Sequence, residues 1–88
     1  MGVRLIEVHL YGKLRRFTDN LDPARESIIK VPAKNGDTIG DVARRIGIPR
    51  EQIGTNIFHN GEYRTLERKV QDGDRVGLFP PDMSILMV

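Results

Sequence analysis

Residues 37–47 read Asp-Thr-Ile-Gly-Asp-Val-Ala-Arg-Arg-Ile-Gly and carry the only clear helix signal in the chain. Asp37 or Thr38 can accept hydrogen bonds from the free N–H groups of a first helical turn. Gly47, followed by Pro49, is typical of a helix end. The apolar residues between these signals recur at i, i+3, i+4 and i+7, and they are Ile39, Val42, Ala43 and Ile46. The pattern therefore predicts one amphipathic helix of about three turns.

Two strands are predicted before this helix. Residues 3–11 alternate between apolar and polar positions, and His9 falls on the face opposite to Ile6, Val8 and Leu10. Period-two alternation is the pattern of a half-buried strand. Residues 26–31 alternate in the same way, and we expect Pro32 to end that strand because proline has no N–H to donate. With a short helical turn at 13–17 and a loop at 18–25, these two strands form a predicted hairpin.

Three further strands are predicted after the helix, at residues 56–59, 62–66 and 75–79. Asn60-Gly61 between the first two is a strong hairpin signal, and Pro80-Pro81 stops the last strand. One amphipathic helix and four or five strands can best bury their apolar faces if the strands form a single mixed sheet that packs on that helix. The expected fold class is α+β, of the ubiquitin-like β-grasp type, with residues 1–81 as the domain and 82–88 as an apolar C-terminal tail.

Composition excludes several kinds of site. The chain has 88 residues, a formal charge of +2, two histidines and no cysteine, so disulfides, thiolate nucleophiles and iron–sulfur ligands are ruled out. No serine triad pattern and no phosphate-binding glycine spacing occurs, and neither His9 nor His59 has the further ligands of a metal site. We therefore expect no enzyme activity, no metal and no cofactor. The small charge excess argues against nucleic acid as a partner, and the lack of a spanning or signal segment indicates a cytoplasmic protein without membrane contact.

Two features are candidates for partner binding. The first is basic: Lys13, Arg15 and Arg16 follow the first strand, and Arg44, Arg45 and Arg50 surround the helix end. These clusters are either an ordinary solvated surface or a docking face for an acidic partner. The second is the run Ile85, Leu86, Met87 and Val88, four consecutive apolar residues. They either pack on their own domain or add to a partner's sheet edge or groove.

Three segments together resemble a known family. They are Tyr11-Gly12-Lys13-Leu14-Arg15-Arg16, the helix start Asp37-Thr38-Ile39-Gly40-Asp41-Val42, and Val70 to Pro81, with Asp72-Gly73-Asp74 before a strand and Phe79-Pro80-Pro81 after it. In this order they are similar to MoaD, the small subunit of molybdopterin synthase, and to ThiS, the carrier of the thiamine pathway. Both are small sulfur-carrier proteins with a β-grasp fold, which agrees with the fold expected from periodicity.

The resemblance implies a role in which the chain end meets another protein. In that family a C-terminal Gly-Gly is adenylated by a separate enzyme and converted to a thiocarboxylate. Here the residues after Pro81 contain no glycine, and no two of the nine glycines are adjacent.

Three alternatives follow. The favoured one is a non-catalytic accessory subunit, monomeric when free, which binds an activating enzyme or a large enzyme subunit linked to molybdenum or tungsten cofactor or to sulfur transfer. The second is an atypical sulfur carrier activated at the Val88 carboxylate, and the third is an unrelated β-grasp module or small enzyme. For the first two, the expected partner-binding residues are Arg15, Arg16, Phe79, Pro80, Pro81 and the run from Ile85 to Val88.

Overall fold

Five strands form one mixed sheet in the order β2-β1-β5-β3-β4. The computed structural model describes residues 4–18 and 27–81. Its strands are β1 (Arg4–Leu10), β2 (Ser27–Ala33), β3 (Ile57–His59), β4 (Glu62–Tyr63) and β5 (Arg75–Leu78). β1 pairs antiparallel with β2 and parallel with β5, and β3 lies antiparallel to both β5 and β4. The expected α+β, ubiquitin-like β-grasp fold is confirmed.

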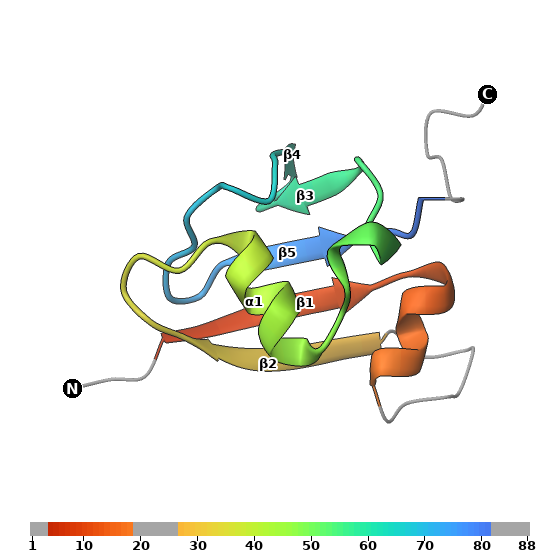
Figure 1. Cartoon of the computed structure of the whole chain (residues 1–88). Helices are drawn as coiled ribbons and strands as arrows, with labels where there is room; N and C mark the ends of the chain where they lie inside the picture. Colours follow the sequence, from red (N-terminus) through yellow and green to blue (C-terminus); the bar gives the residue numbers. More distant parts are fainter. Residues whose placement is uncertain (1–3, 19–26, 82–88) are drawn as a thin grey trace.

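The helix α1 (Ile39–Ile46) lies across one face of this sheet (Figure 1). Thr38 caps it as part of a capping box: the Asp41 N–H donates to Thr38 Oγ1 at 3.2 Å, and the Thr38 N–H donates to Asp41 Oδ2 at 3.0 Å. At the other end Gly47 adopts φ 103°, a left-handed conformation that favours glycine. The helix has 8 residues, about two turns. Our expectation of about three turns was too long, because the left-handed Gly47 directly follows Ile46.

The core lies between α1 and the sheet. Its fully buried members come from β1, β5, α1 and the 3₁₀ helix η1 (Gly12–Phe17), and the largest are Ile6, Val8, Leu10, Leu14, Ile39, Val42, Val76 and Leu78. The period-two positions predicted for the first strand and most of the helical stripe are thus the positions that face the core. Ile46 is only partly buried and packs at its border.

Pro32 corrects one strand boundary. We expected it to end the second strand, but β2 continues through Pro32, which pairs with Leu5, to Ala33. β2 is an edge strand, so one side of its backbone has no neighbouring strand, and a missing N–H on that side breaks no ladder bond.

The strand expected over residues 62–66 is also shorter than predicted. β4 contains only Glu62 and Tyr63, because Leu66 turns away from the sheet and is buried against α1, where the Gly40 N–H donates to the Leu66 carbonyl at 2.9 Å. The Asn60-Gly61 turn between β3 and β4 is formed as predicted, with φ 53° and 85°. No helix among the described residues is long and apolar enough to cross a membrane.

Candidate partner-binding surface

The sheet has an outer face on the side away from α1. In Figure 1 α1 and η2 (Arg50–Gln52) both lie on the near side of the sheet. Successive strand residues point to opposite faces, and Ile6, Val8 and Leu10 of β1 point toward the core. Leu5, Glu7 and His9 therefore point outward.

The exposed large hydrophobic residues in the described part of the chain all lie on this outer face. They are Leu5 at 43%, Ile28 at 40% and Tyr63 at 50% exposure. Ile28 is the β2 partner of His9, and Tyr63 is the β4 partner of Phe58. The three share this face but not one contiguous patch, because Ile28 and Tyr63 lie on the two edge strands and Leu5 lies four residues before His9 on β1. A contiguous apolar patch is what marks an interaction site, so the side chains between them matter.

Four aromatic rings add to the apolar character of this face. The ring of Tyr11 stacks on Phe79 with centroids 4.4 Å apart and planes 8° apart. Phe58 meets the edge of Phe79 at 5.9 Å and Tyr63 at 4.5 Å. Such pairs hold one another in fixed orientations. The outer face therefore carries an ordered aromatic group made from three segments far apart in the sequence: Tyr11, the β3–β4 hairpin with Phe58 and Tyr63, and Phe79.

Gly77 forms the floor of a hollow beside these rings. A Cβ at this position would lie 3.4 Å from the Tyr11 ring and 3.7 Å from Phe58 Cβ. The hollow has a volume of about 260 Å³, and its lining includes His9, Tyr11, Phe58, Arg75 and Gly77. A side chain at 77 would rest on these rings and take up part of the hollow, so the glycine keeps its floor low.

A polar row crosses the same face next to the aromatic group. Glu7 has Lys30 as its β2 partner and Arg75 as its β5 partner. The Glu7 carboxylate lies 2.6 Å from His9 Nε2. Two cations thus flank one carboxylate, which gives the row a net positive charge and makes an acidic partner electrostatically favourable.

The segment Phe79-Pro80-Pro81 leaves the sheet along a fixed path. The Gly54 N–H donates to the Phe79 carbonyl at 2.7 Å. A Cβ on Gly54 would lie 2.9 Å from the Pro80 carbonyl oxygen and 3.1 Å from Pro81 Cα. The backbones of the two segments are therefore in contact, and only glycine permits this approach without a shift.

The structure separates the sequence-predicted site residues. Phe79 and Pro80 are buried and Pro81 is exposed. Arg16 joins Pro80 and Pro81 in the lining of a hollow of about 360 Å³ and hydrogen-bonds to Gln52. Arg15 instead donates to Ser27 Oγ at 2.8 Å, at the start of β2. The predicted residues Ile85, Leu86, Met87 and Val88 lie outside the described residues.

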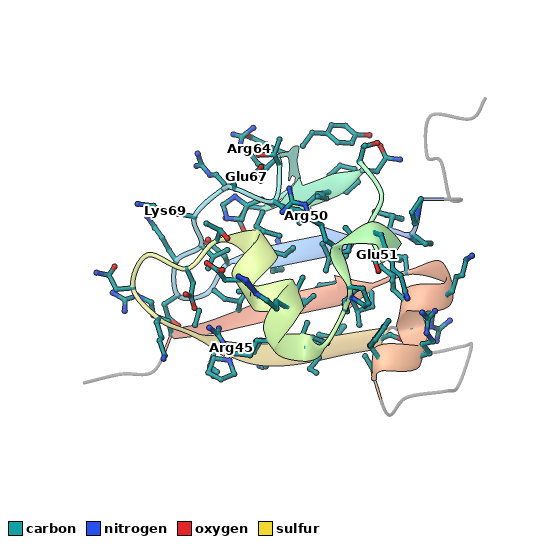
Figure 2. All side chains as sticks on the ribbon, viewed as in Figure 1. Arg45, Arg50, Glu51, Arg64, Glu67 and Lys69 are labelled. Carbon is teal, nitrogen blue, oxygen red and sulfur yellow. The ribbon has the colours of Figure 1, made fainter. Side chains whose placement is uncertain are left out.

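The second basic cluster lies on the opposite side of the molecule from the outer face. Figure 2 labels Arg45 on α1 and Arg50 on η2. Arg45 pairs with Asp37 at 2.9 Å and Arg50 with Glu67 at 2.9 Å, while Arg44 pairs with Asp41. The hydrogen bond from the Thr38 N–H, followed by that from the Arg44 guanidinium, lowers the pKa of Asp41 to about 2. These cations have acidic partners within the domain, which is the pattern of a solvated surface.

His59 and Asp74 form a buried pair that the sequence did not reveal. His59 Nε2 lies 2.7 Å from Asp74 Oδ2, and Asp74 also accepts from Asn60 Nδ2 at 3.0 Å and from the Gln71 N–H at 2.7 Å. Burial raises the pKa of the Asp74 carboxyl, but these hydrogen bonds outweigh burial and hold the pKa below its usual value. The pair joins the β3–β4 turn to the start of β5, so its role is structural. Within the described ranges, no three metal-ligating side chains come together.

Sequence reasoning missed Tyr11, Phe58 and Tyr63 as members of one surface. Alternation places each of them on a strand face, but their meeting depends on how β1, β5, β3 and β4 pair in the sheet. Phe58 opposite Tyr63 across Asn60-Gly61 was the one available signal, because a two-residue hairpin fixes that register.

Comparisons with known proteins agree with this architecture. Residues 3–85 match the family described as Mut7-C ubiquitin. The fold is shared with small archaeal modifier protein 1 of H. volcanii, at 22% identity and a TM-score of 0.65 over 89% of this chain and 98% of that one. It is also shared with the putative molybdopterin converting factor, subunit 1, from Pyrococcus furiosus, at 22% identity and a TM-score of 0.64 over the same shares. No curated protein sequence matches. The resemblance to MoaD-like proteins is confirmed at the level of the fold.

Proposed function

Because this chain belongs to the Mut7-C ubiquitin family, we propose that it is a non-catalytic ubiquitin-like domain that binds a partner protein through the outer face of its sheet. The observation that supports this most is that Leu5, Ile28 and Tyr63 are exposed on the same face of the sheet as an ordered aromatic group. Burying this face removes apolar area from water, and the fixed rings lose little conformational freedom on binding. The free protein is monomeric in this proposal.

The partner is a larger protein. The description of the family joins a ubiquitin-like fold with Mut7-C, so a purified Mut7-C protein is the first partner to test. An activating enzyme or a large subunit of a molybdenum, tungsten or sulfur-transfer enzyme is the next, because one protein with the same fold is a putative molybdopterin converting factor subunit.

Site-specific photocrosslinking tests the proposed face. A photoreactive amino acid is placed at Tyr63 on the outer face or at Arg44 on α1, both of which are exposed. We expect the partner to be trapped from position 63 and not from position 44. Leu5→Ser combined with Tyr63→Ser is expected to weaken binding of the purified partner at least tenfold, the effect of losing two apolar anchors. Equal trapping from both positions would contradict the proposal.

A second candidate function is that of a sulfur carrier activated at its terminal carboxylate. The anchored path of Phe79-Pro80-Pro81 favours it, since the contact with Gly54 fixes the point from which the chain continues. Incubation of the full-length protein with ATP and an activating enzyme, followed by intact mass spectrometry, tests this function. Replacement of one carboxylate oxygen by sulfur supports it, and an unchanged mass in the presence of an enzyme active on its own carrier rejects it.

A further inference from the structure

The β2 edge of the sheet has unpaired backbone groups whose direction can be derived. In an antiparallel pair, the N–H and C=O of one residue point to the same side, and those of the next residue to the other side. The Leu5 N–H and C=O both bond on the β5 side of β1, to Asp72 Oδ1 at 2.8 Å and to the Gly73 N–H at 3.0 Å. The Glu7 N–H also points to the β5 side, where it donates to the Asp74 carbonyl at 2.9 Å.

The β2 partners of these residues must then point away from β1. Leu5, Glu7 and His9 pair with Pro32, Lys30 and Ile28. Arg45 supplies an independent check, because its Nη1 donates to the Pro32 carbonyl at 2.7 Å from the open side of the strand. Figure 2 labels Arg45 at the β2 side of α1. The open edge therefore offers the N–H and C=O groups of Ile28 and Lys30, which form no hydrogen bond with a described residue on this side.

The edge is closed at one end and open in the middle. Pro32 has no N–H, and Arg45 occupies its carbonyl, so pairing cannot continue past residue 31. Ile28 and Lys30 together leave two donors and two acceptors in one row, which is enough for a short added strand. The opposite edge of the sheet, β4, contains only two residues and offers less.

The side chains around this edge define the chemistry of an added strand. On the outer face Ile28 is 40% exposed and Lys30 lies beside it. On the helix face Ile29 and Ile46 are only partly buried. Lys34 is exposed just past the end of β2. Neither lysine forms an ion pair with a described carboxylate, although Glu7 is the cross-strand neighbour of Lys30. Apolar side chains fit next to the isoleucines, and carboxylates fit next to the lysines.

We propose that β2 takes up an extended, acidic and apolar segment of a partner protein as a sixth strand of the sheet. Main-chain hydrogen bonds to Ile28 and Lys30 would supply the register, and the isoleucines and lysines would select the sequence. A second copy of this chain is a poorer occupant, because edge-to-edge pairing would bring the same lysines together. The site shares the Ile28 and Lys30 side chains with the outer-face surface but adds the backbone groups of β2, so loss of the backbone bonds tests this proposal without testing the outer face.

The test uses a short synthetic peptide whose central Val and Ile residues are followed by a run of Asp. Titration into the isotope-labelled full chain is followed by amide chemical shifts and by fluorescence anisotropy of a labelled peptide. We expect the largest shifts at residues 28–31. A peptide of the same sequence with N-methyl groups on alternate backbone nitrogens keeps its side chains but loses donors, and it is expected to bind at least about tenfold more weakly.

Substitutions at one position separate charge from backbone. Lys30→Gln removes the charge and keeps the N–H, and it should weaken binding about threefold. Lys30→Pro also removes the outward N–H, and it should weaken binding about tenfold further. Its fold is expected to remain intact, because that N–H takes part in no ladder bond. The urea unfolding midpoint checks this directly, and the N-methylated peptide tests the same bonds without any substitution in the protein.

Three results would overturn the proposal. The first is equal affinity of the plain and the N-methylated peptide. The second is equal affinity of a folded Lys30→Pro and the Lys30→Gln protein. The third is a set of shifts confined to Leu5, Phe58 and Tyr63, which would assign the peptide to the outer face instead. Concentration-dependent shifts at 28–31 without peptide would show that a second copy occupies the edge.

Discussion

Gly54 is the residue on which the path of the last segment depends. Its N–H holds the Phe79 carbonyl, and its Cα lies against the backbone of Pro80 and Pro81. Gly54→Ala would place a methyl group 2.9 Å from the Pro80 carbonyl oxygen, a distance that forces one backbone to move. We expect a loss of about 1–3 kcal/mol in the free energy of unfolding, the usual range for overpacking. Urea denaturation measures this loss.

The neighbouring Thr55→Ala is the matched control. Thr55 is exposed, so its substitution is expected to change stability by less than about 0.5 kcal/mol. Equal stability of Gly54→Ala and the wild-type protein would show that the two segments are not held in this contact.

Asp74 predicts a pH dependence of stability. Its pKa is lower in the folded protein than its usual value, so the stability it contributes is fully present above the unfolded pKa and is lost as pH falls through the folded one. The free energy of unfolding should therefore decrease as pH drops from about 5 to below 4. Asp74→Asn should be less stable at pH 7 and should lose less on acidification.

The difference in free energy of unfolding between the wild-type protein and Asp74→Asn, followed against pH, isolates the contribution of Asp74. Asp37, Asp41 and Glu67 also have lowered pKa values, and they titrate in both proteins. Urea denaturation at a series of pH values gives the two curves, and parallel curves would exclude Asp74 as a source of the acid sensitivity.

At the scale of the element, α1 depends on its capping box. Thr38 Oγ1 accepts from the Asp41 N–H, which would otherwise have no partner within the helix. Thr38→Ala should reduce the free energy of unfolding by about 1 kcal/mol, whereas Thr38→Ser keeps the acceptor and should stay close to the wild-type value. Thermal or urea unfolding of the three proteins decides this, and an equal loss in both variants would assign the effect to packing of the Thr38 methyl group.

The elements also show what sequence could and could not predict. The helix start, its Gly47 end and the Asn60-Gly61 turn were predicted because each depends on residues that are adjacent in the chain. The extent of β2 was wrong because the tolerance of Pro32 depends on its being at an edge, which is a property of the whole sheet. The predicted length of β4 was wrong because Leu66 packs against α1, a contact between segments that are distant in the sequence.

For the whole molecule, the β-grasp architecture was predictable because one amphipathic helix and several short strands leave few ways to bury their apolar faces. The candidate surface was predictable only in part. Phe79 was singled out from the sequence, but the aromatic group it joins and the open backbone of β2 exist only once the order β2-β1-β5-β3-β4 and its registers are set. A shift of one residue in any pairing would turn these side chains to the other face.

The predicted domain boundary after Pro81 is a property of the whole molecule and can be tested by truncation. The buried side chains of the described residues run from Ile6 to Pro80. The Gly54 N–H donates to the Phe79 carbonyl and so holds the backbone just after β5. A chain ending at Pro81 should therefore fold, with a free energy of unfolding within about 1 kcal/mol of the full chain, the range of changes outside a core. Urea denaturation and amide spectra of the two proteins measure this. A chain of residues 1–79, which loses Pro80 and Pro81 from their contact with Gly54, should be less stable by a margin similar to that of Gly54→Ala. If the chain ending at Pro81 instead loses well over 1 kcal/mol of unfolding free energy and its core amides shift, residues 82–88 belong to the folded domain, and the run from Ile85 to Val88 packs on its own sheet rather than on a partner.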